Sequence, residues 1–72
     1  MAKFELTKSI EARKLNPRTM VPLNEWHTIP FGGIIENLAD KGEMEQFSYL
    51  GEYYQYPGED LKPASHPILP VT

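Results

Sequence analysis

The sequence contains no cysteine among its 72 residues, and this absence excludes several ways of stabilising a small domain. Disulfide bonds are impossible, and the common structural zinc sites, which all use cysteine thiolates, are excluded with them. A chain of this length buries only about 60% of the surface that its unfolded form exposes. We therefore expect one small domain with a thin apolar core, holding neither a metal ion nor a cofactor.

Long hydrophobic runs are also missing. The longest stretch without a polar side chain, Ile29 to Ile35, contains one proline and two glycines. It is far shorter than the roughly 20 residues that a membrane-spanning helix needs. The first residues alternate polar with apolar side chains and lack the continuous apolar stretch of a secretory signal. We therefore expect a cytoplasmic protein without a membrane segment.

Basic charge is scarce and unevenly distributed, with a net charge of -3. Residues 1–20 carry five of the seven basic side chains, and residues 21–72 carry eight of the ten acidic ones. An acidic total argues against nucleic-acid binding, which needs a basic surface opposite the phosphates. The alternative hypothesis is a single-stranded nucleic-acid binder that uses Arg13, Lys14 and Arg18 beside an aromatic platform.

Residues suited to catalysis are few. No motif joins His27 or His66 to a serine or an aspartate. Carboxylates crowd residues 40–45, but Lys41 interrupts the ligand spacing of a calcium loop, and charged strand edges explain them better. The Gly32-Gly33 pair lacks the lysine of a phosphate-binding loop. We therefore predict no catalytic residue, and a protein that is not an enzyme.

Polar and apolar residues alternate with period two through much of the chain, which indicates strands. Phe4 to Leu15 alternates except at Lys8, so this segment predicts two short strands or one bulged strand. Residues 16–28 mix prolines with apolar side chains, and we interpret them as an ordered loop that either binds a ligand or caps the core. Three further antiparallel strands are predicted at residues 33–39, 43–50 and 53–56, joined by tight turns at Asp40-Lys41-Gly42 and Gly51-Glu52.

In the first of these three strands, Ile34 and Leu38 are expected on one face and Ile35 on the other. Residues 59–62 have room for one helical turn, with Leu61 as its apolar anchor. Three prolines in residues 63–72 predict a tail that does not pair in a sheet, although its Pro67–Pro70 PxxP segment suits an aromatic groove on a second copy. The predicted fold is all-β, an SH3-like small barrel of about five antiparallel strands over residues 3–64, followed by an extended or disordered tail over residues 65–72.

Three short motifs add a family resemblance. Leu15-Asn16-Pro17-Arg18, Ile29-Pro30-Phe31-Gly32 and Gly51-Glu52-Tyr53-Tyr54 resemble the Leu-Asn-x-Arg, apolar-Pro-x-Gly and late Gly-aromatic landmarks of bacterial SH3 domains. The resemblance spans about residues 10 to 64. It implies a small barrel that binds cell-wall peptides or partner proteins across loops and aromatic side chains. The tryptophan common in the middle of that family is replaced by Phe47-Ser48-Tyr49-Leu50, so the wall-binding role does not follow from the fold.

Aromatic residues are numerous for so small an interior. In residues 53–56, alternation places Tyr54 and Tyr56 on one face and Tyr53 on the other, so some rings must be exposed or only half-buried. Exposed tyrosines beside a tryptophan-bearing segment are typical of protein interfaces. We predict a non-catalytic binding or assembly module that contacts a protein or peptide, a second copy included, through Trp26, Tyr53, Tyr54 and Tyr56.

Overall fold

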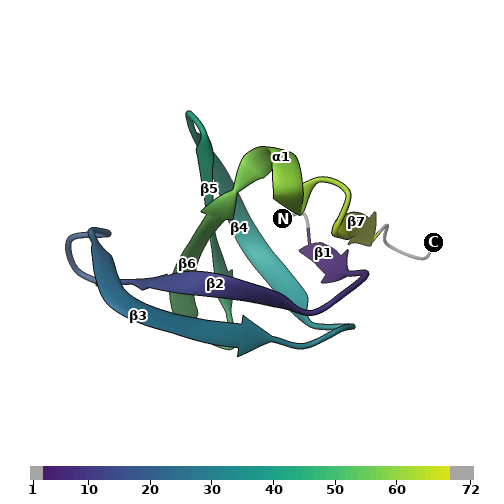
Figure 1. Cartoon of the computed structure of the whole chain (residues 1–72), viewed down its shortest axis with the longest axis horizontal. Coiled ribbons are helices and arrows are strands. Elements are labelled where there is room, and N and C mark those ends of the chain that lie inside the picture. Colours follow the sequence, from purple (N-terminus) through teal and green to yellow (C-terminus); the bar gives the residue numbers. More distant parts are fainter. Residues whose placement is uncertain (1–2, 69–72) are drawn as a thin grey trace.

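The computed structural model describes residues 3–68, and its strands form one antiparallel sheet in the order β3-β2-β6-β5-β4-β1-β7 (Figure 1). The strands are β1 (Lys3–Leu6), β2 (Ile10–Leu15), β3 (Pro22–Ile29), β4 (Ile34–Lys41), β5 (Met44–Tyr49), β6 (Glu52–Pro57) and β7 (Ser65–Ile68), and the helix is α1 (Gly58–Leu61). The all-β prediction is confirmed. The sheet has seven strands in place of the expected five, and it does not close, because β3 and β7 remain as its two edges.

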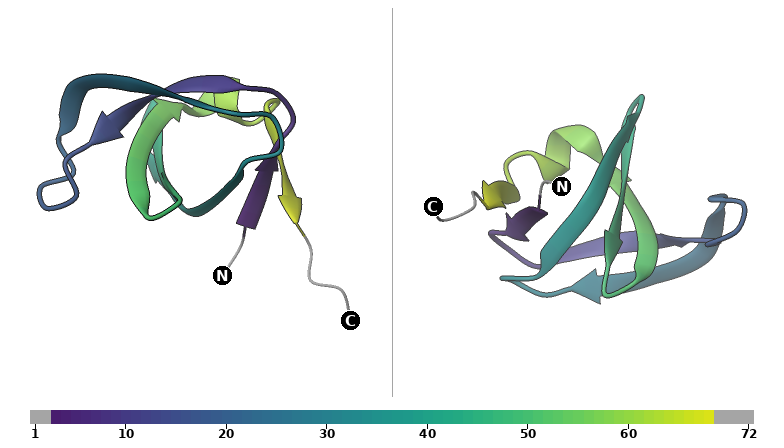
Figure 2. Two further views of the ribbon diagram at one scale, coloured as in Figure 1. Left: turned by 90° about the horizontal axis from the view of Figure 1, so that it is seen from below. Right: turned by 180° about the vertical axis from the view of Figure 1, so that it is seen from behind.

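The sheet curls strongly around one face, which holds the core (Figure 2). Buried apolar side chains from the strands and from the α1 region meet there: Leu6, Ile10, Ala12, Ile29, Ile35, Phe47, Tyr54, Leu61 and Ala64. Curling lets a single sheet cover both sides of a small core, which a flat sheet of this size would leave open to water. We call the core side the inner face and the opposite side the outer face.

The opening segment forms two strands, which confirms one of the two predicted alternatives. Leu6, Ile10 and Ala12 are buried, as their even positions predict, and the chain bends between β1 and β2 where Lys8 is exposed. Because β1 pairs with β4 while β2 pairs with β3 and β6, the bend carries the chain from one half of the sheet to the other.

The predicted loop over residues 16–28 is wrong for its second half. Residues 22–29 form β3, which pairs with β2 from Ile10↔Ile29 to Arg13↔Trp26 and again at Leu15↔Pro22. Between these pairs Lys14 faces the three residues 23–25, so β3 is bulged there. Residues 24–28 are exposed on both faces of this edge strand, which is why the segment shows no hydrophobic alternation.

A bulge in β4 overturns the predicted sharing of a face by Ile34 and Leu38. Asn37 has φ 55°, and the register with β5 shifts between Glu36 and Ala39. After this shift Leu38 packs against the core, whereas Ile34 is exposed. Ile35 is buried, which confirms that it lies opposite Ile34.

Two hairpin turns and a helical turn form near the predicted positions, displaced by one or two residues: Asp40, Lys41 and Glu52 belong to strands, and the turns lie at residues 42–43 and 50–51. At the β4–β5 hairpin, Gly42 has φ 79° and its N–H donates to Oδ1 of Asp40 at 3.1 Å. The β5–β6 hairpin turns at Leu50 and Gly51. Leu61 is buried at the end of α1, as expected of its anchor.

The expectation of an unpaired tail from residue 65 onward is wrong for residues 65–68. These residues form β7, which is extended as expected but pairs with β1 from Lys3↔Ile68 to Leu6↔Ser65. An edge strand needs donors on one side only, so it tolerates Pro67. Residues 69–72 lie outside the described residues. The Pro67–Pro70 segment, which was predicted to suit an aromatic groove on a second copy, therefore lies only partly in the described structure.

Candidate outer-face site

The outer face carries a row of side chains that crosses five strands. The register places Trp26 opposite Arg13, Arg13 opposite Gln55, Gln55 opposite Gln46, and Gln46 opposite Ala39. Directly opposed residues share a face, with Cβ atoms about 5 Å apart. We call these five residues the outer row. Trp26 is 50% exposed and the other four are half-buried, so the row is accessible along its length.

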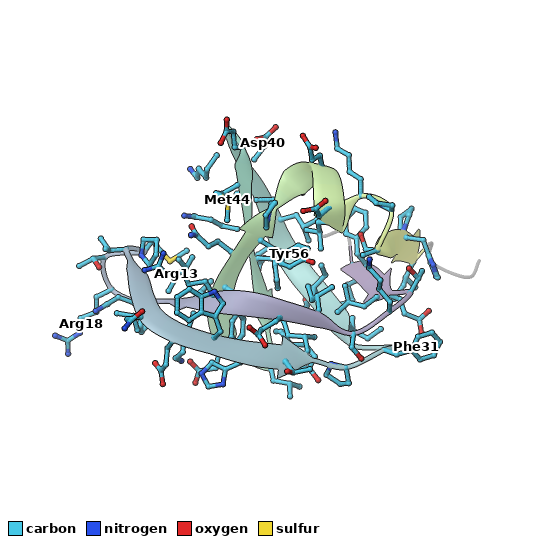
Figure 3. The ribbon with its side chains drawn as sticks, viewed as in Figure 1. Arg13, Arg18, Phe31, Asp40, Met44 and Tyr56 are labelled. Atoms are coloured by element: carbon cyan, nitrogen blue, oxygen red, sulfur yellow. The ribbon has the colours of Figure 1, made fainter. Side chains whose placement is uncertain are left out.

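Arg13 fixes the tryptophan end of the outer row. Its Nε donates a hydrogen bond to the carbonyl oxygen of Leu23 at 2.7 Å, which closes the bulge in β3. Its guanidinium carbon lies 5.0 Å from the centroid of the Trp26 ring, in a cation–π contact. Figure 3 shows Arg13 beside β2 and β3. The indole is therefore held in place while half of it remains exposed.

Two of the four predicted contact residues lie on this face. Tyr53 is two residues from Gln55 on the same strand and therefore shares the outer face with Trp26. It is half-buried and opposes Ser48 of β5. The structure thus places Trp26 and Tyr53 on one surface.

The other two predicted contact residues belong to the inner face. Tyr54 is only 7% exposed, stacks on Phe47 with centroids 6.1 Å apart, and meets His27 edge-on at 5.9 Å. Tyr56 packs against the core, and Figure 3 shows it within the curl of the sheet. The expectation of one four-residue surface is therefore wrong, because Tyr54 is a core residue and Tyr56 faces the same side.

The three basic residues of the alternative hypothesis do not share a surface. Lys14 follows Arg13 on β2 and therefore lies on the opposite face, where it forms a hydrogen-bonded ion pair with Glu52. That hydrogen bond and the opposite charges raise the pKa of Lys14 and lower the pKa of Glu52. Arg18 lies in the loop between β2 and β3, where its backbone N–H donates to Oδ1 of Asn16 at 2.8 Å (Figure 3).

A groove that the sequence analysis did not foresee lies between the β4–β5 hairpin and α1. It has a volume of about 580 Å³, and its lining residues are Asp40, Gly42, Glu43, Met44, Glu45, Pro57, Gly58, Glu59, Asp60 and Lys62. The carboxylates of residues 40–45 were visible in the sequence, but only the folded chain brings them beside Glu59 and Asp60 of α1. Within residues 3–68, no three His, Asp or Glu side chains are arranged to hold a metal ion.

Comparisons with family models, curated proteins and solved structures give no match to this chain. The one helix in the described part of the chain, α1, has four residues and is too short to cross a membrane.

Proposed function

We propose that this chain is a non-catalytic binding module that recognises a protein partner through the outer face of its sheet, with Trp26 and Tyr53 as the main contacts. One observation carries the proposal: half of the Trp26 side chain is exposed while Arg13 holds the ring in place. A rigid, exposed aromatic ring supplies a large contact area and loses little conformational entropy on binding, which is why such rings dominate protein interfaces.

The chemistry of the outer row favours a protein over a nucleic acid. The row contains one cation, Arg13, and that cation already bonds to the Leu23 carbonyl. Gln46 and Gln55 each offer amide donors and acceptors, which suit the backbone and side chains of a polypeptide. Strong phosphate binding needs several basic side chains on one surface. Lys14 lies on the other face, paired with Glu52.

As the finer description of the fold, we propose a relative of the SH3-like small barrels. The three motifs that resemble bacterial SH3 domains begin at the end of β2, at the end of β3 and in the β5–β6 turn, so each includes a connection between successive strands. The strong curl of the sheet also supports the proposal (Figure 2). A binding role for an aromatic surface agrees with what the resemblance implies.

The test is capture of the partner on the immobilised full chain, followed by affinity measurements with the purified partner. Trp26→Ser should weaken binding by about tenfold or more, the loss expected of a central aromatic contact. The matched control is Phe31→Ser, because Phe31 is 73% exposed and lies at the opposite end of the molecule from Arg18 (Figure 3). Unchanged affinity of Trp26→Ser would contradict the proposal.

A further inference from the structure

The guanidinium of Arg13 keeps hydrogen-bond donors at the surface of the outer face. Its Nε donates to the Leu23 carbonyl, which leaves the two Nη groups as further donors. Neither Nη group donates a hydrogen bond within residues 3–68, and no side-chain nitrogen of a buried or half-buried residue there is both enclosed and without a partner. Since Arg13 is half-buried, its Nη groups must therefore reach the surface beside Trp26.

The positive charge of Arg13 also lacks a counter-charge. Within residues 3–68 the Arg13 guanidinium belongs to no ion pair. Glu25, which precedes Trp26 on β3, has its Oε1 3.7 Å from Nε2 of His27 instead. A carboxylate only accepts hydrogen bonds, and its two oxygens match the planar guanidinium. The charge and the unused donors of Arg13 are therefore complementary to a carboxylate.

We propose that the Trp26–Arg13 end of the outer row binds an acidic peptide segment of the partner, with the Arg13 Nη groups on an aspartate or glutamate carboxylate; this inference rests on the proposed function above. The Trp26 ring, held beside the guanidinium, packs against the apolar part of the same segment. A single guanidinium suits one carboxylate, whereas a nucleic acid presents a phosphate at every nucleotide and needs several cations.

The test starts from a phage-displayed library of random peptides, selected on the immobilised full chain. Peptides whose binding Trp26→Ser weakens should be enriched in aspartate and glutamate over the unselected library. Each acidic residue of the tightest-binding peptide is then replaced in turn by its amide. One such replacement should weaken binding to the unmodified chain by about tenfold or more, because it removes one partner of a charge-assisted hydrogen-bonded pair.

Arg13→Gln separates recognition of the carboxylate from the positioning of Trp26. This variant should bind the acidic peptide and its amide counterpart with equal affinity. If Arg13 only held the ring, Arg13→Gln would weaken both peptides by the same factor and keep the difference between them, which would overturn the inference. Arg18→Gln is the matched control, because it removes the same charge from the exposed loop between β2 and β3 and should keep the difference.

Salt dependence gives a second measurement that needs no variant of the chain. Raising the ionic strength should weaken binding of the acidic peptide to the unmodified chain, because salt screens the new ion pair. The affinity for the amide peptide should change little. Equal salt dependence of the two peptides would contradict a contact between Arg13 and the carboxylate.

The outcomes also distinguish this inference from the proposed function. Selected peptides that depend on Trp26 but show no excess of acidic residues would overturn the inference and leave the outer-face module standing. If no selected peptide depends on Trp26, both are contradicted. If the unmodified chain sediments as a dimer and Arg13→Gln as a monomer, a second copy supplies the carboxylate, and the assignment to a separate acidic peptide is wrong.

Discussion

Gly33 lies where the β3–β4 turn approaches the rest of the fold most closely. A Cβ atom at this position would lie 2.9 Å from Cγ2 of Ile29, 3.0 Å from the carbonyl oxygen of Pro30 and 3.1 Å from Cε1 of Tyr49. The Gly33 N–H donates to that same Pro30 carbonyl at 2.9 Å, and its own carbonyl accepts from Leu6. The backbone on both sides is therefore fixed, and only a residue without a side chain fits.

We predict that Gly33→Ala destabilises the fold through overpacking, by an amount in the upper part of about 1–3 kcal/mol. Gly42→Ala is the comparison, because a Cβ there meets nothing within 4 Å and only the φ of 79° opposes it. Its expected cost is about 1 kcal/mol. Urea unfolding of both variants measures the difference, and a Gly33→Ala variant as stable as Gly42→Ala would refute the steric argument.

At the scale of single residues, alternation predicts which side chains share a face but not which face is buried. The sequence correctly separated Tyr53 from Tyr54 and Tyr56. Both faces of β6 carry aromatic rings, however, so nothing in the pattern identified the side of Tyr54 as the core. The anchoring of Trp26 by Arg13 was also hidden, because it depends on the bulge that brings the Leu23 carbonyl within reach.

At the scale of elements, the errors concern the two edge strands and the bulge in β4. The alternation of the aromatic residues in β6 and the burial of Ile10 and Ala12 in β2 were predicted correctly, but Leu15 in β2 and Ser48 in β5 are also buried although they lie on the outer face. β3 and β7 each pair with a single strand and lie largely in water, so their sequences carry no periodic apolar signal. Their strand structure comes from hydrogen bonding to a neighbour far along the chain or across a loop, which local sequence patterns do not encode.

Because β7 pairs with β1, deleting it should destabilise the fold, whereas deleting an unpaired tail would leave the stability unchanged. β7 aligns with the whole of β1, Nε2 of His66 lies 3.2 Å from Oε1 of Glu5, and the Ser65 hydroxyl donates to the Leu61 carbonyl at 2.9 Å. Deleting residues 65–72 should lower the free energy of unfolding by about 1–2 kcal/mol, the net worth of a few hydrogen bonds.

The control for this deletion is His66→Ala, which removes the exposed contact between His66 and Glu5 and keeps the strand. Even a charged pair at the surface contributes little, so this variant should be nearly as stable as the unmodified chain. Thermal unfolding measures both. A deleted chain that unfolds at the same temperature as the full one would show that β7 contributes nothing to the fold.

At the scale of the whole molecule, the open sheet has two edges and two faces, and our proposal assigns the partner to one of these four surfaces. The β3 edge is bulged at residues 23–25, and β7 is short and contains Pro67. Bulges, prolines and short strands are features that discourage a second chain from pairing with an edge. The inner face is filled by the core. The outer face is left as the accessible surface on which aromatic and amide side chains are aligned.

The most direct test of this account is a titration of the isotope-labelled full chain with its captured partner, followed by nuclear magnetic resonance. We predict the largest chemical-shift changes at the indole N–H of Trp26 and at the backbone amides of Tyr53, Gln55 and Gln46. Changes confined to residues 40–45 and 57–62, which line the acidic groove, with the outer row unmoved, would contradict the account.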